Sequence, residues 1–493
     1  MLPSIPKRYL QPLFDIAAIR RREQASFAQE GESFAMMQRA GHALWQHILK
    51  RSPDLQQLAI VVGGGNNGGD GLIVAYLAAQ EGVAVRLYDF ASSARQGDAK
   101  QAMDLLDQQP NVLWCAPESL ADESAGVIVD ALLGIGFKPP LSALYAEAIE
   151  VMNALGKAGA ELVSVDCPSG LELHSGAGEQ AIKADLVVSF IADKVGHHLR
   201  DGAVCCHQVV IETLQAVDLA DAPQAYRLAP SALDTLLPCE RFANSHKGSY
   251  GHVLVLGGDM GMGGAAIMAS EAAGKAGAGT VALLTQPSHL TASLVRNPNV
   301  MCHTDADIDL EQTLRGQDSV VVAGPGLGRS KWSEDQWLAL QKVKAQWLVV
   351  DADGLYWLKQ QPIGAANLII TPHPGEAAML LEQSVQAVLE NLTEAAKQLA
   401  RRYQAVVILK GATSVIADVS GQVVIAGQPC PGLAKGGSGD VLSGVVGACL
   451  AYYKEAFAAA VIGAAWHNKA AQQCANDLGM VTMQPYQLLN YLE

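Results

Sequence analysis

The sequence predicts an α/β protein of two domains, and three observations support this fold class. Short apolar runs typical of buried strands alternate along the chain with helical stretches. Glycine-rich turns follow many of these runs, and glycine supplies 48 of 493 residues, which is about 10% against a usual value of about 7%. The pattern of strand and glycine turn fades near residue 220 and then restarts, which separates two domains.

The first domain is predicted to span residues 1–215. An apolar run at 58–63 precedes glycines, a helical stretch and a second run at 84–90, which indicates a strand–helix–strand unit. Further strand-like runs stand at 126–134, 161–170 and 185–190. Because these runs are apolar almost throughout, we expect a doubly wound parallel sheet with helices on both faces.

Polar and proline residues at 216–230 predict a linker, and residues 231–493 are predicted to form the second domain. Strand-like runs recur through this part of the chain, at 252–261, 280–287, 319–328, 347–355, 367–376 and 405–414. The last signature is LAKGGSGDVLSG at 433–444, ahead of alanine-rich helices. The glycine-rich motifs of the two domains differ, so the domains are not tandem copies.

Composition excludes several classes of function. The formal net charge is −15, so nucleic acid is not an expected partner. Nine scattered cysteines without a CxxC pair predict reduced thiols rather than a disulfide framework or a zinc site. We find no signal-peptide pattern and no membrane span. We expect a cytoplasmic protein that acts on small molecules, with no membrane partner, and we predict a homo-oligomer.

The most distinctive motif of the first half is GGGNNGGDG at 63–71. Between a strand and a helix, its backbone amides and the helix N-terminus can hold a phosphate. It is neither a GxGxxG fingerprint nor a loop with the lysine of a nucleotide-binding P-loop. The alternative is a tight turn in which Asn and Asp adopt left-handed backbone.

Two acids end strands of the same half, and a serine follows the second. Asp130 ends GVIVD, and Asp166 ends ELVSVD just before Ser169. Strand C-termini line the ligand crevice of open α/β sheets, so Asn67, Asp130 and Ser169 would bring oxygen ligands suited to a hard cation. Asp166 is a candidate acid or base at this edge. For each acid alone, the alternative is a helix N-cap.

In the second half, LAKGGSGDVLSG places glycine amides and Asp440 at the start of an apolar helix. The amides form an anion hole for a phosphoryl group, and Asp440 could deprotonate a hydroxyl that attacks it. The alternative is again an N-cap. Lys410 follows an apolar strand and could meet a phosphate or border an adenine pocket, although a lone lysine is usually solvated.

The motifs GNNGGDG, VDALLGIG with Lys138, and VDCPSG together resemble the NAD(P)H-hydrate epimerase domain. The resemblance implies a Rossmann-like fold, a potassium ion, and interconversion of the R and S forms of NAD(P)H hydrated at C6 of the nicotinamide ring. Potassium would be held by Asn67, Asp130 and Ser169, and Asp166 would act on the ring. Ile135 stands where Thr is common, and Gln38 where Glu is common. The implied hydrate-binding residues are Asn66, Asn67, Gly68, Gly69, Asp70, Gly134, Ile135, Gly136, Phe137, Lys138, Pro139, Pro140, Asp166 and Lys194.

GGSGD resembles the ribokinase-like family, whose members phosphorylate hydroxyls. In order, GHVLVLGG, AGPGLG, DADGL, TPHPGE, LKGATS and GGSGDVLSG resemble the ADP-dependent NAD(P)H-hydrate dehydratase branch. His373 stands where sugar kinases often carry Asn, Ser438 replaces a common Thr, and Lys275 a common Arg. The resemblance implies hydrate contacts from Ala265, Gly326, His373 and Asp440. It implies adenine-nucleotide contacts from Lys410, Gly411, Ala412, Thr413, Ser414 and Gly439.

The implied dehydratase chemistry is phosphorylation followed by elimination. ADP phosphorylates the C6 hydroxyl with Asp440 as base, and phosphate then leaves, which restores NAD(P)H with AMP and phosphate as by-products. Magnesium would bridge the ADP phosphates with help from Glu376, while Asp351 and Asp353 are weaker candidates. Two alternatives remain: a vitamin-precursor kinase with an appended domain, and a first half that is a catalytically silent binding module.

Overall fold

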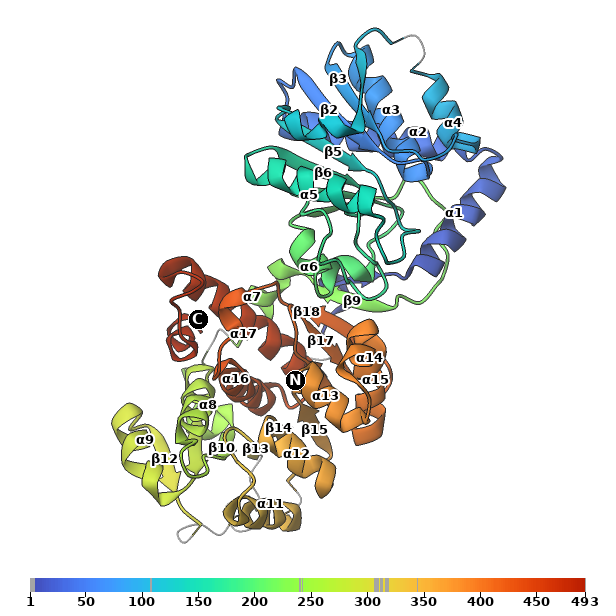
Figure 1. Cartoon of the computed structure of the whole chain (residues 1–493). Helices are drawn as coiled ribbons and strands as arrows, with labels where there is room; N and C mark the ends of the chain where they lie inside the picture. The colour runs from blue at the N-terminus through green and yellow to red at the C-terminus, as the bar shows by residue number, and fades with distance from the viewer. Residues whose placement is uncertain are drawn as a thin grey trace. The chain divides into compact units, whose positions relative to one another are not determined.

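The computed structural model describes residues 5–106, 109–238, 241, 243–305, 310, 314, 319–343 and 345–492. The chain folds into two compact units. The N-terminal unit is Pro12–Gln224, and the C-terminal unit is Ala225–Glu493 together with the residues up to Gln11 (Figure 1). Each unit is an α/β layer structure around its own sheet, as the sequence predicts.

The sheet of the N-terminal unit has the order β4-β3-β2-β5-β6-β7-β8, and all its pairings are parallel. This confirms the predicted parallel sheet. The strands are β2 (Gln57–Val62), β3 (Ala84–Asp89), β4 (Val112–Cys115), β5 (Val127–Ala131), β6 (Glu161–Val165), β7 (Leu186–Phe190) and β8 (Val209–Glu212). The helices are α1 (Ile16–Glu30), α2 (Phe34–Arg51), α3 (Asn66–Gln80), α4 (Gly97–Asp104), α5 (Ala143–Lys157) and α6 (Gly202–Cys205).

Alternate residues of each strand enter two separate cores. Leu58, Ile60 and Val62 of β2 pack with buried residues of α1, α2 and α3, whereas Ala59 and Val61 pack with α5. This alternation follows from the two-residue period of a strand. With both faces covered, the loops at the carboxyl ends of the strands are left to form a site.

The C-terminal sheet has eleven strands in the order β1-β9-β18-β17-β16-β15-β14-β13-β10-β11-β12. It is mixed, because β17 runs antiparallel to both β16 and β18. Only four residues join β16 to β17, too few for the crossover that a parallel pair requires. The strands are β1 (Leu10–Leu13), β9 (Ala225–Leu228), β10 (His252–Leu256), β11 (Thr280–Leu284), β12 (Val300–His303), β13 (Ser319–Ala323), β14 (Trp347–Val350), β15 (Asn367–Ile370), β16 (Val406–Leu409), β17 (Ser414–Ala417) and β18 (Val423–Ala426).

One face of this sheet packs against α8, α16 and α17, which contribute most of one large core (Figure 1). α16 is buried nearly all round between α8 and α17, which explains its apolar sequence. No helix in the described part of the chain is long and apolar enough to cross a membrane. The helices are α7 (Leu233–Leu236), α8 (Gly263–Lys275), α9 (Leu290–Arg296), α11 (Lys331–Val343), α12 (Asp353–Gln360), α13 (Pro374–Leu381), α14 (Val385–Glu390), α15 (Leu392–Tyr403), α16 (Ser438–Tyr453) and α17 (Ala456–Leu478).

The structure divides the chain at different places from the predicted boundaries of 215 and 231. The units separate after Gln224, inside the predicted linker, and Ala225–Leu228 is the strand β9. The residues up to Gln11 belong to the C-terminal unit, because β1 extends its sheet beside β9 and Ile5 and Leu10 are buried in its core. A short edge strand without an adjacent motif gives little signal in the sequence.

The main structural role of the glycines in the 63–71 motif is to allow close packing, because most of the motif is helix rather than loop. The helix α3 already begins at Asn66, so most of the motif is helical. A Cβ on Gly68 would lie 2.0 Å from the carbonyl oxygen of Gly63, and one on Gly71 would lie 2.6 Å from the Ala131 Cβ. These glycines let α3 lie directly against the strand ends, which brings Asn66, Asn67 and the following turn to the sheet edge.

This close packing generates a prediction about stability. Gly68→Ala should lower the free energy of unfolding of the N-terminal unit by about 1–3 kcal/mol, because the new methyl group meets backbone that cannot move freely. Gly126→Ala is the matched control, since a Cβ there meets nothing within 4 Å. Hydrogen exchange of the α3 amides measures the effect. Equal protection in the two variants would contradict the packing role.

Candidate functional site

A cavity of about 390 Å³ opens at the carboxyl ends of the strands in the N-terminal unit. Side chains of α1 and α2, the start of α3, the turn after β5 and the ends of β6 and β7 line it. The structure thus brings most of the predicted epimerase residues to one place. Those that line the cavity are Asn66, Asn67, Asp70, Gly134, Ile135, Gly136, Phe137 and Asp166.

The other predicted residues of this half lie outside the lining. Gly68 and Gly69 are buried in the packing of α3. Lys138, Pro139 and Pro140 are exposed, and Lys194 is fully buried behind Asp166. The motif therefore marks the neighbourhood of the cavity, but spacing along the chain does not tell a lining residue from a supporting one.

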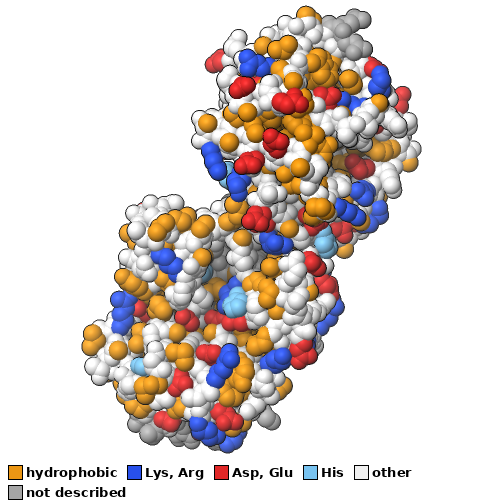
Figure 2. Space-filling view, viewed as in Figure 1, with side chains coloured by type: hydrophobic (Ala, Val, Ile, Leu, Met, Phe, Trp, Pro, Cys, Tyr) orange, Lys and Arg blue, Asp and Glu red, His pale blue; other side chains and the backbone are white. Residues whose placement is uncertain are grey.

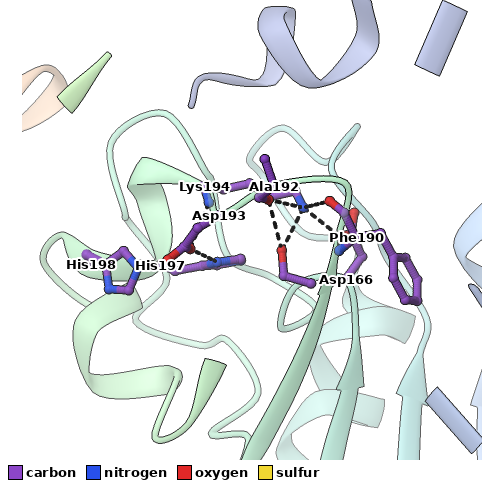
Figure 3. Close-up of polar contacts among 8 residues, drawn as sticks. Asp166, Phe190, Ala192, Asp193, Lys194, His197 and His198 are labelled. Carbon is purple, nitrogen blue, oxygen red and sulfur yellow. Dashed lines mark hydrogen bonds and ion pairs between the residues drawn. The ribbon is translucent and has the colours of Figure 1, made fainter. Parts of the chain in front are cut away.

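Asp166 and Lys194 form a buried ion pair at the cavity wall (Figure 3). Lys194 is 0% exposed, and its Nζ donates to Asp166 Oδ1 at 2.6 Å, Ser189 Oγ at 2.7 Å and the Phe190 carbonyl at 3.0 Å. Asp166 Oδ1 also accepts from the Phe190 amide at 2.8 Å. Both bonds end on Oδ1, so within the described residues Oδ2 is the carboxyl oxygen without a partner.

The backbone of Asp166 is in the left-handed region, with φ of 62°. A non-glycine residue there is strained and persists only when its surroundings hold it. The bonds from Lys194 and Phe190 supply that hold. Asp166 is therefore a fixed carboxylate in the cavity wall with one oxygen unpaired among the described residues, which is an arrangement that suits a general base.

The segment that carries Lys194 is itself anchored (Figure 3). Asp193 lies between two histidines, with Oδ2 2.8 Å from His198 Nε2 and Oδ1 3.3 Å from His197 Nδ1. Burial acts to raise the pKa of Asp193, but the two histidines outweigh it and hold the pKa well below its usual range. The sequence analysis missed these three residues, although Asp193 directly precedes Lys194 and both histidines follow within four residues.

The cavity is acidic. Glu23, Asp70, Asp98 and Asp166 line it, and the described lining contains no Lys, Arg or His. Burial raises the pKa of Glu23, and the charge of Asp166 adds to the effect. Burial together with Asp166, Glu23 and Asp98 raises the pKa of Asp70 well above its ordinary value. The two carboxyls thus hold a proton more readily than exposed ones do.

Glu23 is a lining residue that sequence reasoning missed. Ile19, Glu23 and Phe27 are four residues apart on α1, so they share one helix face, and all three line the cavity. The signal in the sequence was an acidic residue placed between two apolar residues at a spacing of four, the spacing of one helix face. It identifies a helix face, but not what the face covers.

Asn67, Asp130 and Ser169 lie around the turn that follows β5. Asn67 Nδ2 donates to the Leu133 carbonyl at 3.0 Å, and the Leu133 amide donates to Ser169 Oγ at 2.8 Å. Asp130 is buried and accepts from the Ser169 amide at 2.8 Å. Burial raises the pKa of Asp130, although its hydrogen bonds oppose the shift. The structure therefore places Asn67, Asp130 and Ser169 around the peptide groups of Leu133 and Ser169, with the Asn67 contact made through its nitrogen.

In the C-terminal unit, Asp440 lies in the first turn of α16, where four charged side chains meet. Lys410 Nζ contacts Asp351 Oδ1 at 2.9 Å and Glu376 Oε2 at 3.9 Å. Burial and the charge of Asp351 raise the pKa of Asp440 to about 7, against the opposing charge of Lys410. Asp351, a weaker candidate from sequence, is thus a direct partner of Lys410.

The remaining predicted residues of this unit fall around that cluster. A Cβ on Gly439 would lie 3.3 Å from Lys410 Nζ, so glycine lets the ammonium approach the start of α16. Gly411, Ala412 and Thr413 form the β16–β17 turn after Lys410, and Ser414 begins β17. His373 caps α13 and is exposed, with Nε2 3.6 Å from Glu376 Oε1.

Gly326 and Ala265, two predicted contacts of the hydrate, lie next to each other, whereas Asp353 is bonded to a neighbouring loop. A Cβ on Gly326, whose φ is +57°, would lie 3.1 Å from the Ala265 Cβ. Asp353 accepts from the Gly328 amide at 3.0 Å and pairs with Arg329, so it orders the loop after β13. The acids and Lys410 therefore form the chemical centre, and Asp353 supports the chain beside it.

Comparisons with known proteins cover both units. A family model described as NAD(P)H-hydrate dehydratase matches residues 253–493, and one described as the N-terminus of YjeF-related proteins matches residues 33–196. The bifunctional NAD(P)H-hydrate repair enzyme of Coxiella burnetii is 37% identical over 475 residues, covering 95% of this chain and 96% of the relative. The Vibrio cholerae enzyme of the same description is 36% identical over 488 residues, 96% of each chain.

A solved structure supports the fold. A ribokinase-like superfamily protein from Enterococcus faecalis is 22% identical, with a TM-score of 0.50, over 56% of this chain and 96% of its own. The predicted fold class and the resemblance drawn from the motifs are both confirmed. Since relatives more than 30% identical span almost its whole length, this chain belongs to the family of bifunctional NAD(P)H-hydrate repair enzymes.

Proposed function

We propose that this chain repairs hydrated NAD(P)H in two reactions, one in each unit. The N-terminal cavity interconverts the R and S hydrates, and the C-terminal unit dehydrates the S form at the expense of ADP. The observation that carries the proposal is a pair of aspartates, Asp166 and Asp440, each with a lysine nearby. Asp166 is bonded to buried Lys194, and Asp440 at the start of α16 is under the opposing charge of Lys410. Family membership supplies the substrate that both would share.

In the epimerase reaction, Asp166 Oδ2 acts on the hydrated ring. The ammonium of Lys194 compensates the charge of the carboxylate, and the strained backbone fixes its direction. The amides at the start of α3 and the turn at Gly134 and Gly136 bind the dinucleotide. Because few cations are near, these backbone groups are the main source of attraction for its phosphates.

In the dehydratase reaction, Asp440 takes the proton of the C6 hydroxyl as that oxygen attacks the terminal phosphate of ADP. The amides of the GGSGD turn and the N-terminus of α16 stabilise the charge on the phosphoryl group. Lys410 balances the carboxylates of Asp351 and Glu376. Phosphate is a better leaving group than hydroxide, so the phosphorylated hydrate eliminates readily to NAD(P)H.

Two metal ions belong to the proposal. The oxygen cluster of Asn67, Asp130, Ser169 and the Leu133 carbonyl fits a hard cation such as potassium, whose charge would favour the ionised form of buried Asp130. Among the described residues, no group of three or more His, Cys, Asp or Glu side chains is arranged to hold a metal ion, so the proposed potassium site depends on amide, hydroxyl and carbonyl oxygens as well. Glu376 and Asp351 are carboxylates suited to magnesium, which would neutralise charge on the ADP phosphates.

Potassium dependence is directly testable. Exchange of potassium for lithium should slow epimerisation of NADH hydrate, because the smaller ion fits the same oxygens poorly, while ADP-dependent dehydration of the S form continues. The two rates are measured on the same preparation by chromatography of the epimers and by NADH absorbance. Epimerisation that is equally fast in both salts would contradict the potassium assignment.

The two aspartates should separate the activities. Asp166→Asn should slow R-to-S conversion by about 100-fold or more, the usual loss when a general acid–base group is removed. Asp440→Asn should abolish ADP-dependent dehydration and leave epimerisation intact, so each variant is the control for the other. The assay follows prepared NADH hydrate with ADP and then with ATP. Retained dehydration in Asp440→Asn would refute its role as base.

The dehydratase should also show a defined pH dependence. Asp440 acts as a base only when ionised, and its pKa is raised to about 7 by burial and by Asp351. The value of kcat/KM should therefore fall as pH drops below about 7 and level off above it. Dehydration of S-hydrate is measured across neutrality with ADP saturating. A plateau that extends well into acid would show that another group limits the reaction.

A further inference from the structure

The mechanism so far gives the epimerase cavity a base but no acid. In one route to inversion, the hydroxyl leaves one face of C6 and water arrives at the other. A hydroxyl leaves well only when it is protonated, so a proton donor is needed as well as a base. Asp166 has one free oxygen and cannot serve both faces at once. The second group must therefore come from elsewhere in the lining.

Among the described lining residues, Glu23 fits this need best. It lies on the cavity face of α1 between Ile19 and Phe27, whereas Asp166 follows β6, so two different elements deliver the two carboxyls. Glu23 is partly buried and has no hydrogen bond or ion pair to another described residue. Asp166, by contrast, is tied to Lys194. One carboxyl is thus paired with an ammonium, whereas the other has no bonded partner among the described residues.

We infer that Glu23 is a second catalytic residue of the epimerase site and acts as proton donor where Asp166 acts as base. The inference rests on the proposed role of the cavity as the epimerase site. Glu23 and Asp166 would stand on either side of the ring, and reversal of the reaction would exchange their roles. Pairs of titratable groups whose surroundings favour opposite protonation states commonly divide acid and base work in this way.

The reaction balances with these two groups. The C6–O bond breaks, its electron pair goes to oxygen, and that oxygen takes the Glu23 proton and leaves as water. The lone pair of the ring nitrogen forms a C=N bond to C6. Water then adds to the opposite face of C6, the C=N pair returns to nitrogen, and Asp166 takes a proton from the new hydroxyl. One proton has passed from Glu23 to Asp166. Asp166 then gives its proton to solvent water and Glu23 takes one from it, which restores both groups before the next turnover.

The charge of the cavity suits the intermediate. Loss of hydroxide leaves a positive ring, and an environment of fixed negative charge stabilises positive charge that develops in a reaction. Glu23, Asp70, Asp98 and Asp166 line the cavity without a described cation in the lining. An acidic cavity would be unfavourable for the phosphates of the substrate, but it is favourable for the ring. This places the nicotinamide end, rather than the pyrophosphate, among the acids.

The protonation state of Glu23 is consistent with the role. The groups that act on it are Asp166, Lys194 and Arg20, and Asp70 is coupled to it. Burial and Asp166 raise the pKa of Glu23, while Lys194 and Arg20 oppose the shift and are outweighed. A raised pKa keeps the acid form present to higher pH. The donor role should therefore be lost as pH rises through that pKa.

Glu23→Gln tests the inference in the full-length chain. The amide keeps the size of the side chain but cannot give up a proton in catalysis, so kcat for epimerisation should fall about 100-fold or more while KM changes little. The pH profile should also lose its alkaline limb. Glu23→Asp, which keeps the acid on a shorter side chain, should recover part of the rate.

Glu30→Gln on the same helix is the matched control and should epimerise at the wild-type rate. Glu30 pairs with Arg39 at 2.8 Å and does not line the cavity. Dehydration of S-hydrate with ADP should be unchanged in every variant. A wild-type rate in Glu23→Gln would overturn the inference, and so would a loss that appears in KM alone with both pH limbs retained.

An isotope experiment tests the chemistry independently of the variants. In water enriched in ¹⁸O, each enzymatic inversion should place one solvent oxygen on C6, after subtraction of the uncatalysed exchange. Inversion without uptake of ¹⁸O would rule out departure and return of water, and with it the donor role of Glu23. Failure of the wild-type chain to epimerise at all would instead refute the proposed function itself.

Discussion

The buried ion pair between Lys194 and Asp166 is the constraint on which the N-terminal site depends. An ammonium without solvent is costly unless acceptors surround it, and here a carboxylate, a hydroxyl and backbone carbonyls do so. The same bonds hold Asp166 in left-handed backbone at the cavity wall and leave its second oxygen unpaired among the described residues. Asp193, bonded to His197 and His198, fixes the segment that carries Lys194. The contacts that stabilise this edge of the sheet are therefore the same ones that position the proposed base.

The C-terminal unit also pairs a lysine with carboxylates, although the residues come from different elements. Lys410 is surrounded by Asp351, Glu376 and Asp440, so a single ammonium balances several carboxylates. Neither unit collects many cations, and Figure 2 shows acidic and basic side chains scattered over the visible surface rather than gathered into a basic area. If the proposed dinucleotide and ADP bind to this acidic chain, backbone amides and the proposed metal ions would supply the attraction for their phosphates.

Much of this architecture could be predicted from the sequence. Apolar runs located the strands, and residues such as Asp166 and Asp440 stood out because each follows a strand or precedes a helix beside glycines. The supporting contacts could not be predicted. Lys138 and Lys194 look alike in a motif, yet one is exposed and the other wholly buried. Glu23 lies far from any motif, since its place depends on which sheet edge α1 covers. Whether a residue is buried or lines the cavity depends on how the helices pack on the sheet, and motif spacing does not show this.

The division of the chain limits how the two units can be separated from each other. The C-terminal unit contains the residues up to Gln11 as well as those after Gln224, so the N-terminal unit is an insertion between an edge strand and the rest of the sheet. Two domains fused end to end would be joined by a single crossing of the chain, and here there are two. A C-terminal unit expressed from Ala225 onwards would lack β1, which would leave β9 as an unpaired sheet edge. The C-terminal unit of this chain would therefore need residues from before the inserted unit to complete its sheet.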